Sequence, residues 1–343
     1  MSATKKPGFG VIGSGILGEE HALVFSHMPE IELIAVCDVN AGRAKALAEK
    51  FGARTWYTDY QELLKNPDIQ AVSVATPDHL HGDITIAAAE AKKDILVEKP
   101  LATSLKEAEA IEAAVKKSGV KLMVDYQNRV NPPFVAAKKS IEAGEIGKPI
   151  YGYIRLSNTT WVPMEMIPWG AKSSSLWFLA IHTIDMMRWL LQDEVKRVYA
   201  VSRSGVLKNL GVDTQDFHVA IAEFKNGAVV TFENAWILPR SQPMVYEFKM
   251  ELLGSQGEIN VNTSHHAAIE KHTDGKMAYG DVFGTTPTSP RRLGGFVKEA
   301  ISQFVDSIVY DQPVLATLED GMAGVRVADA ILRSEQAGAP VEL

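Results

Sequence analysis

The sequence has almost no cysteine, since its 343 residues include only Cys37. One cysteine cannot form an internal disulfide, so a disulfide-stabilised secreted scaffold is excluded and a reducing compartment is expected. Cys37 lies in an apolar stretch, where a buried thiol is usually inert. No apolar run is long enough to cross a bilayer, and residues 1–8 are polar and lead directly into a predicted strand. We therefore expect a cytoplasmic protein with no membrane partner.

Charge of one sign is not concentrated in any part of the sequence. The 35 Lys and Arg residues and the 42 Asp and Glu residues give a net charge of -7, without a run of either sign suited to nucleic acid or anionic lipid. We therefore expect no nucleic-acid partner. A chain of 343 residues is long for one hydrophobic core, so two domains are predicted, each stable without crosslinks.

A metal-ligand set is also missing. His79 and His81 lie close together after a predicted strand at 71–75, but the residues around them do not complete a set of ligands. We therefore predict no metal. Thr76 and His81 are interpreted instead as residues at the edge of a cofactor site.

A glycine-rich turn between a predicted strand and a predicted helix is the first functional motif. Gly13 permits the tight turn, Gly15 lets backbone amides approach a pyrophosphate, and Gly18 allows the helix to pack against the sheet. The turn therefore predicts a dinucleotide site, and Ile16 and Leu17 at the start of the helix join the glycines as candidate cofactor contacts.

The next predicted strand, 32–37, ends in Asp38, about twenty residues after the glycines. A carboxylate at this point accepts hydrogen bonds from the adenosine ribose hydroxyls and repels a ribose phosphate, so NAD is favoured and NADP is less favoured. Arg43 lies nearby and weakens this preference. An alternative interpretation makes Asp38 the N-cap of the predicted helix 41–51.

Predicted strands and helices alternate up to residue 124, a rhythm typical of βαβ units. We therefore predict that residues 1–126 form an NAD(P)-binding Rossmann domain with a doubly wound parallel sheet. One of its strands is 95–97, which Glu98, Lys99 and Pro100 follow.

Functional residues gather at the carboxyl ends of parallel strands. Lys99 can stabilise an alkoxide there, and Glu98 can pair with Lys99 or accept a hydrogen bond from a ribose hydroxyl. The alternative is a solvent-exposed ion pair before a loop proline. We also predict a cis Lys99–Pro100 peptide. Gln127 and Arg129, after the last strand of this domain, are expected to border the site.

The motifs together resemble the Gfo/Idh/MocA family of glucose-fructose oxidoreductases, inositol dehydrogenases and rhizopine-catabolism proteins. The resemblance rests on the GxGxxG turn, on 76–81 and on 98–100, and it continues through 143–147 and 181–185. It implies an NAD(P)-dependent oxidoreductase that acts on a sugar or a cyclic polyol, with Lys99 and His182 at the reacting carbon.

One position departs from the family pattern. The family usually carries an aspartate one helical turn before the histidine, and this sequence has Phe178 there. Three interpretations remain open. Phe178 packs on an apolar part of the substrate, a neighbouring loop supplies the missing acceptor, or turnover has been lost.

The predicted helix 176–191 is amphipathic, with Phe178, His182, Asp185 and Trp189 on one face. Spacing alone favours a core histidine, but the resemblance implies a catalytic one. We predict that His182 is the general base toward the substrate hydroxyl, that Lys99 stabilises the oxyanion and that Asp185 orients His182.

Residues 127–343 are predicted to form a substrate-binding and oligomerisation domain of the α+β type. Long alternating runs, among them 217–224, are joined by hairpin signals and predict a large, open and mainly antiparallel sheet. Two amphipathic helices are predicted at 296–309 and 318–336. Helices are expected to cover one face of the sheet, so we expect a homodimer or homotetramer through the other face. The apolar side chains of that other face are predicted to be Phe217, Phe232, Tyr246 and Phe248. The alternative is a half-solvated sheet.

The segment 158–175 is rich in Trp, Met and Pro and is interpreted as a loop over the substrate, because sugar sites favour aromatic platforms. It is equally compatible with a subunit contact. The candidate substrate residues are Arg129, Asn158, Trp161, Phe178 and Trp236.

These observations favour an NAD-dependent oxidoreductase that transfers hydride from a secondary hydroxyl or a lactol of a sugar or cyclic polyol, such as inositol, to NAD. One alternative is a non-catalytic regulator that binds NAD and a sugar. The other is a redox-neutral enzyme, a glycosidase or an epimerase, that uses NAD transiently.

Overall fold

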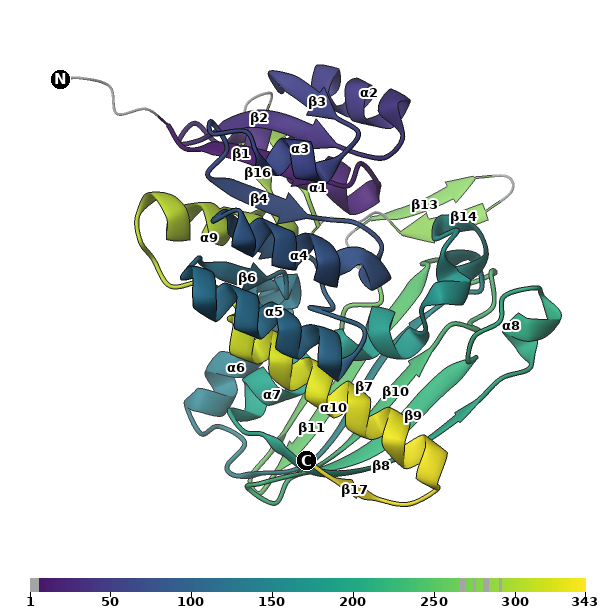
Figure 1. Ribbon diagram of the computed structural model, residues 1–343. Coiled ribbons are helices and arrows are strands. Elements are labelled where there is room, and N and C mark those ends of the chain that lie inside the picture. Colours follow the sequence, from purple (N-terminus) through teal and green to yellow (C-terminus); the bar gives the residue numbers. More distant parts are fainter. Residues whose placement is uncertain (1–5, 266–268, 274–275, 280–283, 290–291) are drawn as a thin grey trace. The chain divides into compact units, whose positions relative to one another are not determined.

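The computed structural model describes residues 6–265, 269–273, 276–279, 284–289 and 292–343 (Figure 1). The chain forms two compact units. The first consists of Met1–Gln127 and Gly284–Met322, and the second of Asn128–Phe283 and Ala323–Leu343. The predicted boundary lies at residue 126, but the chain later returns to the first unit. Among the described residues, no helix is both long and apolar enough to cross a membrane.

The first unit contains a six-stranded sheet in the order β3-β2-β1-β4-β5-β6, with every pair of neighbours parallel. The order reverses beside β1, as in a doubly wound sheet, which confirms the predicted fold class. Its elements are β1 (Gly8–Ile12), α1 (Ile16–His27), β2 (Glu32–Cys37), α2 (Ala41–Phe51), β3 (Thr55–Tyr57), α3 (Tyr60–Leu64), β4 (Ala71–Val74), η1 (Asp78–Leu80), α4 (His81–Glu90), β5 (Asp94–Val97), α5 (Leu105–Ser118) and β6 (Leu122–Val124).

The segment Gly284–Met322 belongs to the first unit because one of its helices completes the hydrophobic core of that unit. Helix α9 (Phe296–Val309) contributes Phe304, whose ring lies 5.9 Å from that of Phe9 in β1. The ring of Phe9 also lies 5.1 Å from that of Phe25 in α1. The strands are buried apolar runs, so they need apolar helices on their faces. The sequence predicted the helix at 296–309 but not the sheet against which it packs. The same segment contains β15 (Thr286–Ser289) and β16 (Arg292–Gly294).

The second unit contains a seven-stranded sheet in the order β12-β11-β7-β10-β9-β8-β17. Only β7 and β10 are parallel neighbours in it, which confirms a mainly antiparallel sheet. The elements are η2 (Gln127–Val130), α6 (Pro132–Glu142), β7 (Pro149–Asn158), η3 (Val162–Met166), η4 (Gly170–Lys172), η5 (Leu176–Ala180), α7 (Ile181–Leu191), β8 (Val195–Arg203), α8 (Val206–Asn209), β9 (Phe217–Phe224), β10 (Val229–Ala235), β11 (Tyr246–Gly254), β12 (Glu258–Asn262), β13 (Glu270–Thr273), β14 (Lys276–Tyr279), the later part of α10 (Leu318–Ala337), and β17 (Val341–Glu342).

Helices cover one face of this sheet. Helix α7 and the preceding η5 contact β7 and β10, and the later part of α10 runs across β8 and β9 (Figure 1). Two polar contacts fix α10 there: Ser334 Oγ accepts from the backbone N–H of Ala200, and Glu335 lies 2.8 Å from His218 Nδ1. The face that these helices cover, which we call the inner face, is therefore buried along its strands.

The opposite, outer face carries a different set of apolar side chains from the predicted one. Phe232 and Phe248 are 1% and 3% exposed and belong to the inner face, where Phe248 packs on Phe134 of α6. That part of the prediction was wrong, because side chains alternate between the two faces and these two phenylalanines fall at the buried positions of their strands. The outer face instead exposes four large apolar side chains on β7, β8, β9 and β11: Tyr151, Tyr199, Ile221 and Leu253.

Candidate functional site

The glycine turn after β1 has the shape that a dinucleotide requires. Gly13 has φ +104°, and a Cβ on it would lie 2.3 Å from the carbonyl oxygen of Ala75. A Cβ on Gly18 would lie 1.9 Å from the carbonyl oxygen of Gly13, so both positions demand glycine. A Cβ on Gly15 would meet no atom within 4 Å, and no side chain caps the start of α1. The turn therefore leaves open space at a helix N-terminus, which fits the pyrophosphate of NAD.

Asp38 is held at the edge of this turn. One carboxylate oxygen accepts from the backbone N–H of Ser14 at 2.9 Å, and the other accepts from the backbone N–H of Asn40 at 2.8 Å. Helix α2 is capped by Asn40, whose side chain accepts from the N–H of Arg43. The alternative in which Asp38 caps this helix is therefore wrong. Of the helix residues beside the turn, Ile16 is 62% exposed.

Thr76 and His81 follow β4 at the same edge of the sheet. The two ring nitrogens of His81 lie 2.9 Å from the carbonyl oxygen of Thr76 and 2.6 Å from that of Pro100. His81 thus links the end of β4 to the segment after β5. The hydroxyl of Thr76 is buried and has no hydrogen-bond partner among the described residues, so it is available to a ligand.

Glu98 and Lys99 are both buried, which excludes the alternative of a solvent-exposed pair. The Lys99–Pro100 peptide is cis, as predicted. Burial lowers the pKa of Lys99, and the carboxylates of Glu98, Asp78 and Asp125 oppose this effect. Glu98 points into the unit, with one carboxylate oxygen 3.1 Å from His21 Nε2. This partner of Glu98 was not predicted from the sequence.

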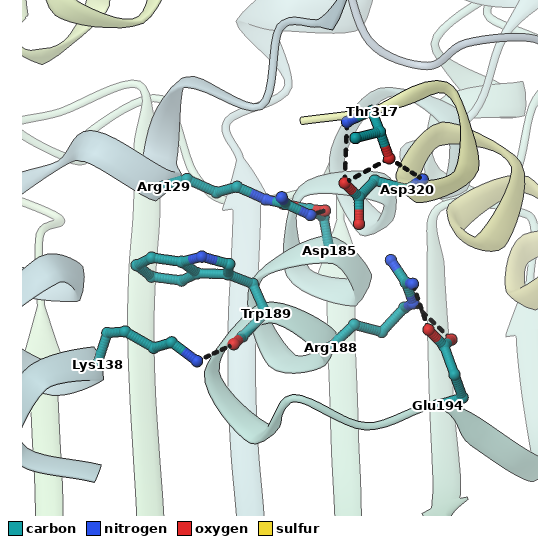
Figure 2. Close-up of polar contacts among 8 residues, drawn as sticks. All are labelled: Arg129, Lys138, Asp185, Arg188, Trp189, Glu194, Thr317 and Asp320. Carbon is teal, nitrogen blue, oxygen red and sulfur yellow. Dashed lines mark hydrogen bonds and ion pairs between the residues drawn. The ribbon is translucent and has the colours of Figure 1, made fainter. Parts of the chain in front are cut away.

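The second unit places His182 in α7 beside Asn128. The side-chain nitrogen of Asn128 lies 3.5 Å from His182 Nδ1. Both carboxylate oxygens of Asp185 accept from Arg129, at 3.0 Å from Nε and 2.6 Å from Nη2 (Figure 2). Arg129 was predicted as a substrate residue and Asp185 as a partner of His182. The structure joins the two in a buried ion pair, and their roles toward a substrate stay predictions.

The predicted helix 176–191 begins with a π-helical turn, η5, that continues into α7. Helix α7 is buried on almost every side rather than amphipathic. Such wide turns are frequent at functional sites, because they displace side chains from the regular helical faces. The ring of Phe178 in η5 lies 5.9 Å from that of Trp169 and 5.7 Å from that of Trp236. Phe178 is therefore part of an aromatic cluster with these two tryptophans.

Asn158 and Trp236 share the carboxyl edge of the two parallel strands β7 and β10. The parallel pairing ends at Glu233 and Arg155, and beyond it the backbone N–H of Leu238, two residues after Trp236, donates to the carbonyl oxygen of Asn158. The Asn158 side-chain oxygen is buried without a hydrogen-bond partner among the described residues, and Trp236 is fully buried. These two predicted substrate residues thus come together. Trp161, at the start of η3, is half-buried.

Asn234 is a residue that the sequence analysis missed. Its side chain donates to the carbonyl oxygen of Leu156 and accepts from the hydroxyl of Thr183, and its backbone oxygen accepts from Ser175. These contacts attach η5 and α7, and with them His182, to β7 and β10. The only signal in the sequence is an amide side chain on the strand face that otherwise carries Val230 and Phe232.

The Arg129–Asp185 pair yields a stability prediction. Arg129→Met should lower the free energy of unfolding by about 3–5 kcal/mol, because it leaves the Asp185 carboxylate, which is 2% exposed, without its cation. The matched control is Arg188→Met, since Arg188 is equally buried but pairs with the 46% exposed Glu194 (Figure 2). It should cost about 1 kcal/mol. Urea unfolding of both variants checks the difference, and equal losses would contradict it.

Comparison with known proteins gives consistent matches. Two family models match, "oxidoreductase family, NAD-binding Rossmann fold" over residues 8–126 and "oxidoreductase family, C-terminal alpha/beta domain" over residues 138–343. Scyllo-inositol 2-dehydrogenase (NAD(+)) from Bacillus subtilis is 33% identical, over 97% of this chain and 95% of its own. Levoglucosan dehydrogenase from Pseudarthrobacter phenanthrenivorans is 34% identical over 65% of this chain and 66% of its own.

A solved structure agrees with these sequence matches. GenD2 from gentamicin A biosynthesis, in complex with NAD, superimposes with a TM-score of 0.83 at 27% identity, over 100% of this chain and 98% of that one.

Proposed function

Because the chain belongs to the Gfo/Idh/MocA oxidoreductase family, we propose that it oxidises a secondary hydroxyl or a lactol of a sugar or cyclic polyol, with NAD as the hydride acceptor. The comparisons confirm the family, the enzyme class and the cofactor that were predicted from the sequence. The observation that carries the proposal is the open glycine turn at the start of α1, with the buried Lys99 on the same edge of the sheet.

The first unit supplies the groups that hold NAD. Its pyrophosphate fits the turn, where the absence of a side chain at Gly15 leaves room, and Asp38 accepts from the adenosine ribose. Bound NAD supplies the hydride acceptor. The proposed cofactor contacts are Gly13, Gly15, Ile16, Leu17, Asp38, Thr76, His81, Glu98 and Gln127.

The chemistry is assigned to three residues. His182 accepts the proton of the substrate hydroxyl, and Lys99, as an ammonium ion, stabilises the alkoxide that forms before hydride leaves the same carbon. Asp185 keeps α7 in place through its pair with Arg129 and is proposed to orient His182. Each residue acts on a different part of the same step, so loss of any one should reduce turnover.

The substrate class follows from the second unit. An unsatisfied amide oxygen on Asn158 can accept from a hydroxyl, and the aromatic rings of Phe178 and Trp236 can contact C–H groups of a sugar ring. Relatives named for inositol and for levoglucosan agree with a polyhydroxylated ring. Arg129 and Trp161 complete the proposed substrate residues.

Absorbance at the NADH band tests this function. Purified protein is mixed with NAD or NADP and a panel of inositols, aldoses, sugar acids and levoglucosan. We expect NADH to accumulate with one compound class and faster than NADPH. A flat signal together with tight binding of NAD and a sugar in calorimetry would contradict the proposal and favour a regulator. Epimerised or cleaved sugar without net NADH would favour a redox-neutral enzyme.

Phe178 should determine which ring is accepted. Phe178→Asp removes the ring that lies between two tryptophans and adds a hydroxyl acceptor. We expect the ratio of kcat/KM for inositols to that for the best substrate to rise about 10-fold, since a site that accepts a hydroxyl hydrogen bond favours a substrate that donates one. Phe178→Leu keeps the apolar surface and is the control. An unchanged ratio in Phe178→Asp would show that another group supplies the acceptor.

We further propose that two copies associate through the outer face of the seven-stranded sheet, as a homodimer or as part of a homotetramer. Tyr151, Tyr199, Ile221 and Leu253 are 41–48% exposed there. Ile221→Glu should lower the mass measured by light scattering, and Leu210→Glu, equally exposed but beyond α8, should not. A monomeric wild-type protein would contradict the proposal. The cytoplasmic location stays a prediction.

A further inference from the structure

Three ionisable side chains, which we call the His21 cluster, meet in the interior of the first unit. His21 of α1 lies 3.1 Å from Glu98 and 3.5 Å from Asp125, the residues that follow β5 and β6. Its other ring nitrogen lies 2.6 Å from the hydroxyl of Ser73 in β4. The three side chains are at most 3% exposed. Such a buried group is unusual in the core of a parallel sheet, because each charge loses its hydration.

The charges of the cluster balance only if His21 is protonated. Two carboxylates carry two negative charges, and His21 and the neighbouring Lys99 then supply two positive ones. Burial alone would lower the pKa of His21, but the neighbouring carboxylates of Asp125 and Glu98 raise it to about 9. Burial raises the pKa of Asp125 to about 6, whereas His21 holds the pKa of Glu98 below its usual value against the effect of burial.

Other charges act on the same groups from neighbouring elements. Glu20 in α1 raises the pKa of Asp125, His81 in α4 lowers that of Glu98, and Asp78 in η1 raises that of Lys99. None of these replaces His21, whose Nε2 lies 3.1 Å from a carboxylate oxygen of Glu98 and 3.5 Å from one of Asp125.

We propose that His21 is a positioning residue for the proposed reaction: its imidazolium holds Glu98 and Asp125 together and thereby fixes Lys99, the next residue in the chain after Glu98. The inference rests on the proposed function, because it concerns the step in which Lys99 stabilises the alkoxide. His21 itself touches neither the substrate nor the reacting atoms, so its effect is exerted through Glu98. Misplacement of a catalytic group by about 1 Å can cost about 100-fold in rate.

A cation is a different possible occupant of the same three side chains, since their donor atoms lie within 4.8 Å of one another. The surroundings argue against it. A divalent ion next to the Lys99 ammonium would place three positive charges against two carboxylates among buried side chains, where charges are poorly screened. Both ring nitrogens of His21 also lie at hydrogen-bond distance from protein oxygens.

The experiment combines histidine NMR with the pH dependence of kcat for the proposed reaction. His21 is assigned in wild-type protein by comparison with His21→Gln. We expect its imidazolium to persist to about pH 9 and kcat to fall through the same pH. His21→Gln should have a kcat about 10- to 100-fold lower at pH 7.5, KM values within about threefold of wild type, and no such fall near pH 9.

The NMR titration distinguishes His21 from Lys99, because it follows the imidazole ring alone. Asp125→Asn removes a carboxylate that raises the pKa of both His21 and Lys99, so the His21 titration and the fall in kcat should both move to lower pH. His218→Gln is the matched control, because His218 is a buried histidine paired with Glu335 in the second unit. It should leave the pH profile unchanged.

Stability supplies a readout that needs no turnover. The raised pKa of His21 means that its contribution to stability is fully present below about pH 6.5 and is lost as pH rises through about 9. The difference in melting temperature between wild type and His21→Gln should shrink over this interval.

Several results would overturn the inference: a His21 that titrates at or below pH 6.5, a His21→Gln variant with wild-type kcat and profile, or a stoichiometric metal in wild type that His21→Gln lacks. If His21→Gln does not fold, the wild-type titration and Asp125→Asn decide. A wild-type protein that reduces NAD with no compound contradicts the proposed function instead, and the His21 titration and melting temperatures still test the cluster.

Discussion

Replacing His182 by glutamine should lower kcat by about 10²- to 10⁴-fold while leaving the dissociation constant of NAD within about threefold. Glutamine keeps hydrogen-bonding capacity but cannot take up the proton of a hydroxyl group. The loss should fall on kcat rather than KM, because the imidazole is needed when the O–H bond breaks. Single-turnover absorbance at the NADH band and calorimetry with NAD measure the two quantities separately.

His218→Gln is again the control, because it removes a buried imidazole from the same unit without touching α7. A His182→Gln variant with wild-type kcat would exclude His182 as the base. Loss of NAD binding in the same variant would instead indicate a structural defect. Asn234→Ala should have a milder effect in the same direction, since Asn234 attaches α7 to the sheet but leaves the imidazole in place.

The elements themselves were largely predictable from the sequence. The strand at 217–224 and the helix at 296–309 were predicted with the observed bounds, because alternation and helical periodicity are local signals. The glycine turn was predictable for a similar reason: Gly13 and Gly18 answer steric demands that the motif spacing encodes, and Gly15 leaves open space at the helix N-terminus. Periodicity could not indicate which sheet α9 would cover, because the apolar face of an amphipathic helix does not specify the surface on which it packs.

The partners of charged residues were much less predictable. Helical spacing placed Asp185 beside His182, but the bidentate contact comes from Arg129, in a different element. Glu98 was expected to pair with Lys99 or to face the cofactor, and it contacts His21 of α1. In each case the partner lies more than fifty residues away, and only the fold brings the two side chains together. A single sequence can identify candidate ionisable residues, but it does not show which other side chains they contact.

Lys99→Met should lower kcat by about 10²- to 10³-fold and at the same time make the protein more stable at neutral pH. Methionine has a similar length and no charge, so the alkoxide loses its stabilising ammonium ion. The gain in stability has a separate cause. Burial lowers the pKa of Lys99 below 10.5, which means that the folded state disfavours the protonated form. That penalty is present at neutral pH and vanishes as pH rises above 10.5.

A lower kcat together with a higher stability distinguishes this prediction from a loss of activity alone. A residue that merely supports the fold would lose activity and stability together, whereas a functional charge held in a dry site lowers stability in exchange for activity. Lys99→Arg keeps the charge and should lower kcat less than Lys99→Met. Urea unfolding at pH 7.5 and at pH 10.5 should show the stability gain of Lys99→Met shrinking with pH. If Lys99→Met is instead less stable and its kcat falls no further than that of Lys99→Arg, the ammonium ion is structural and the alkoxide must be stabilised by another group.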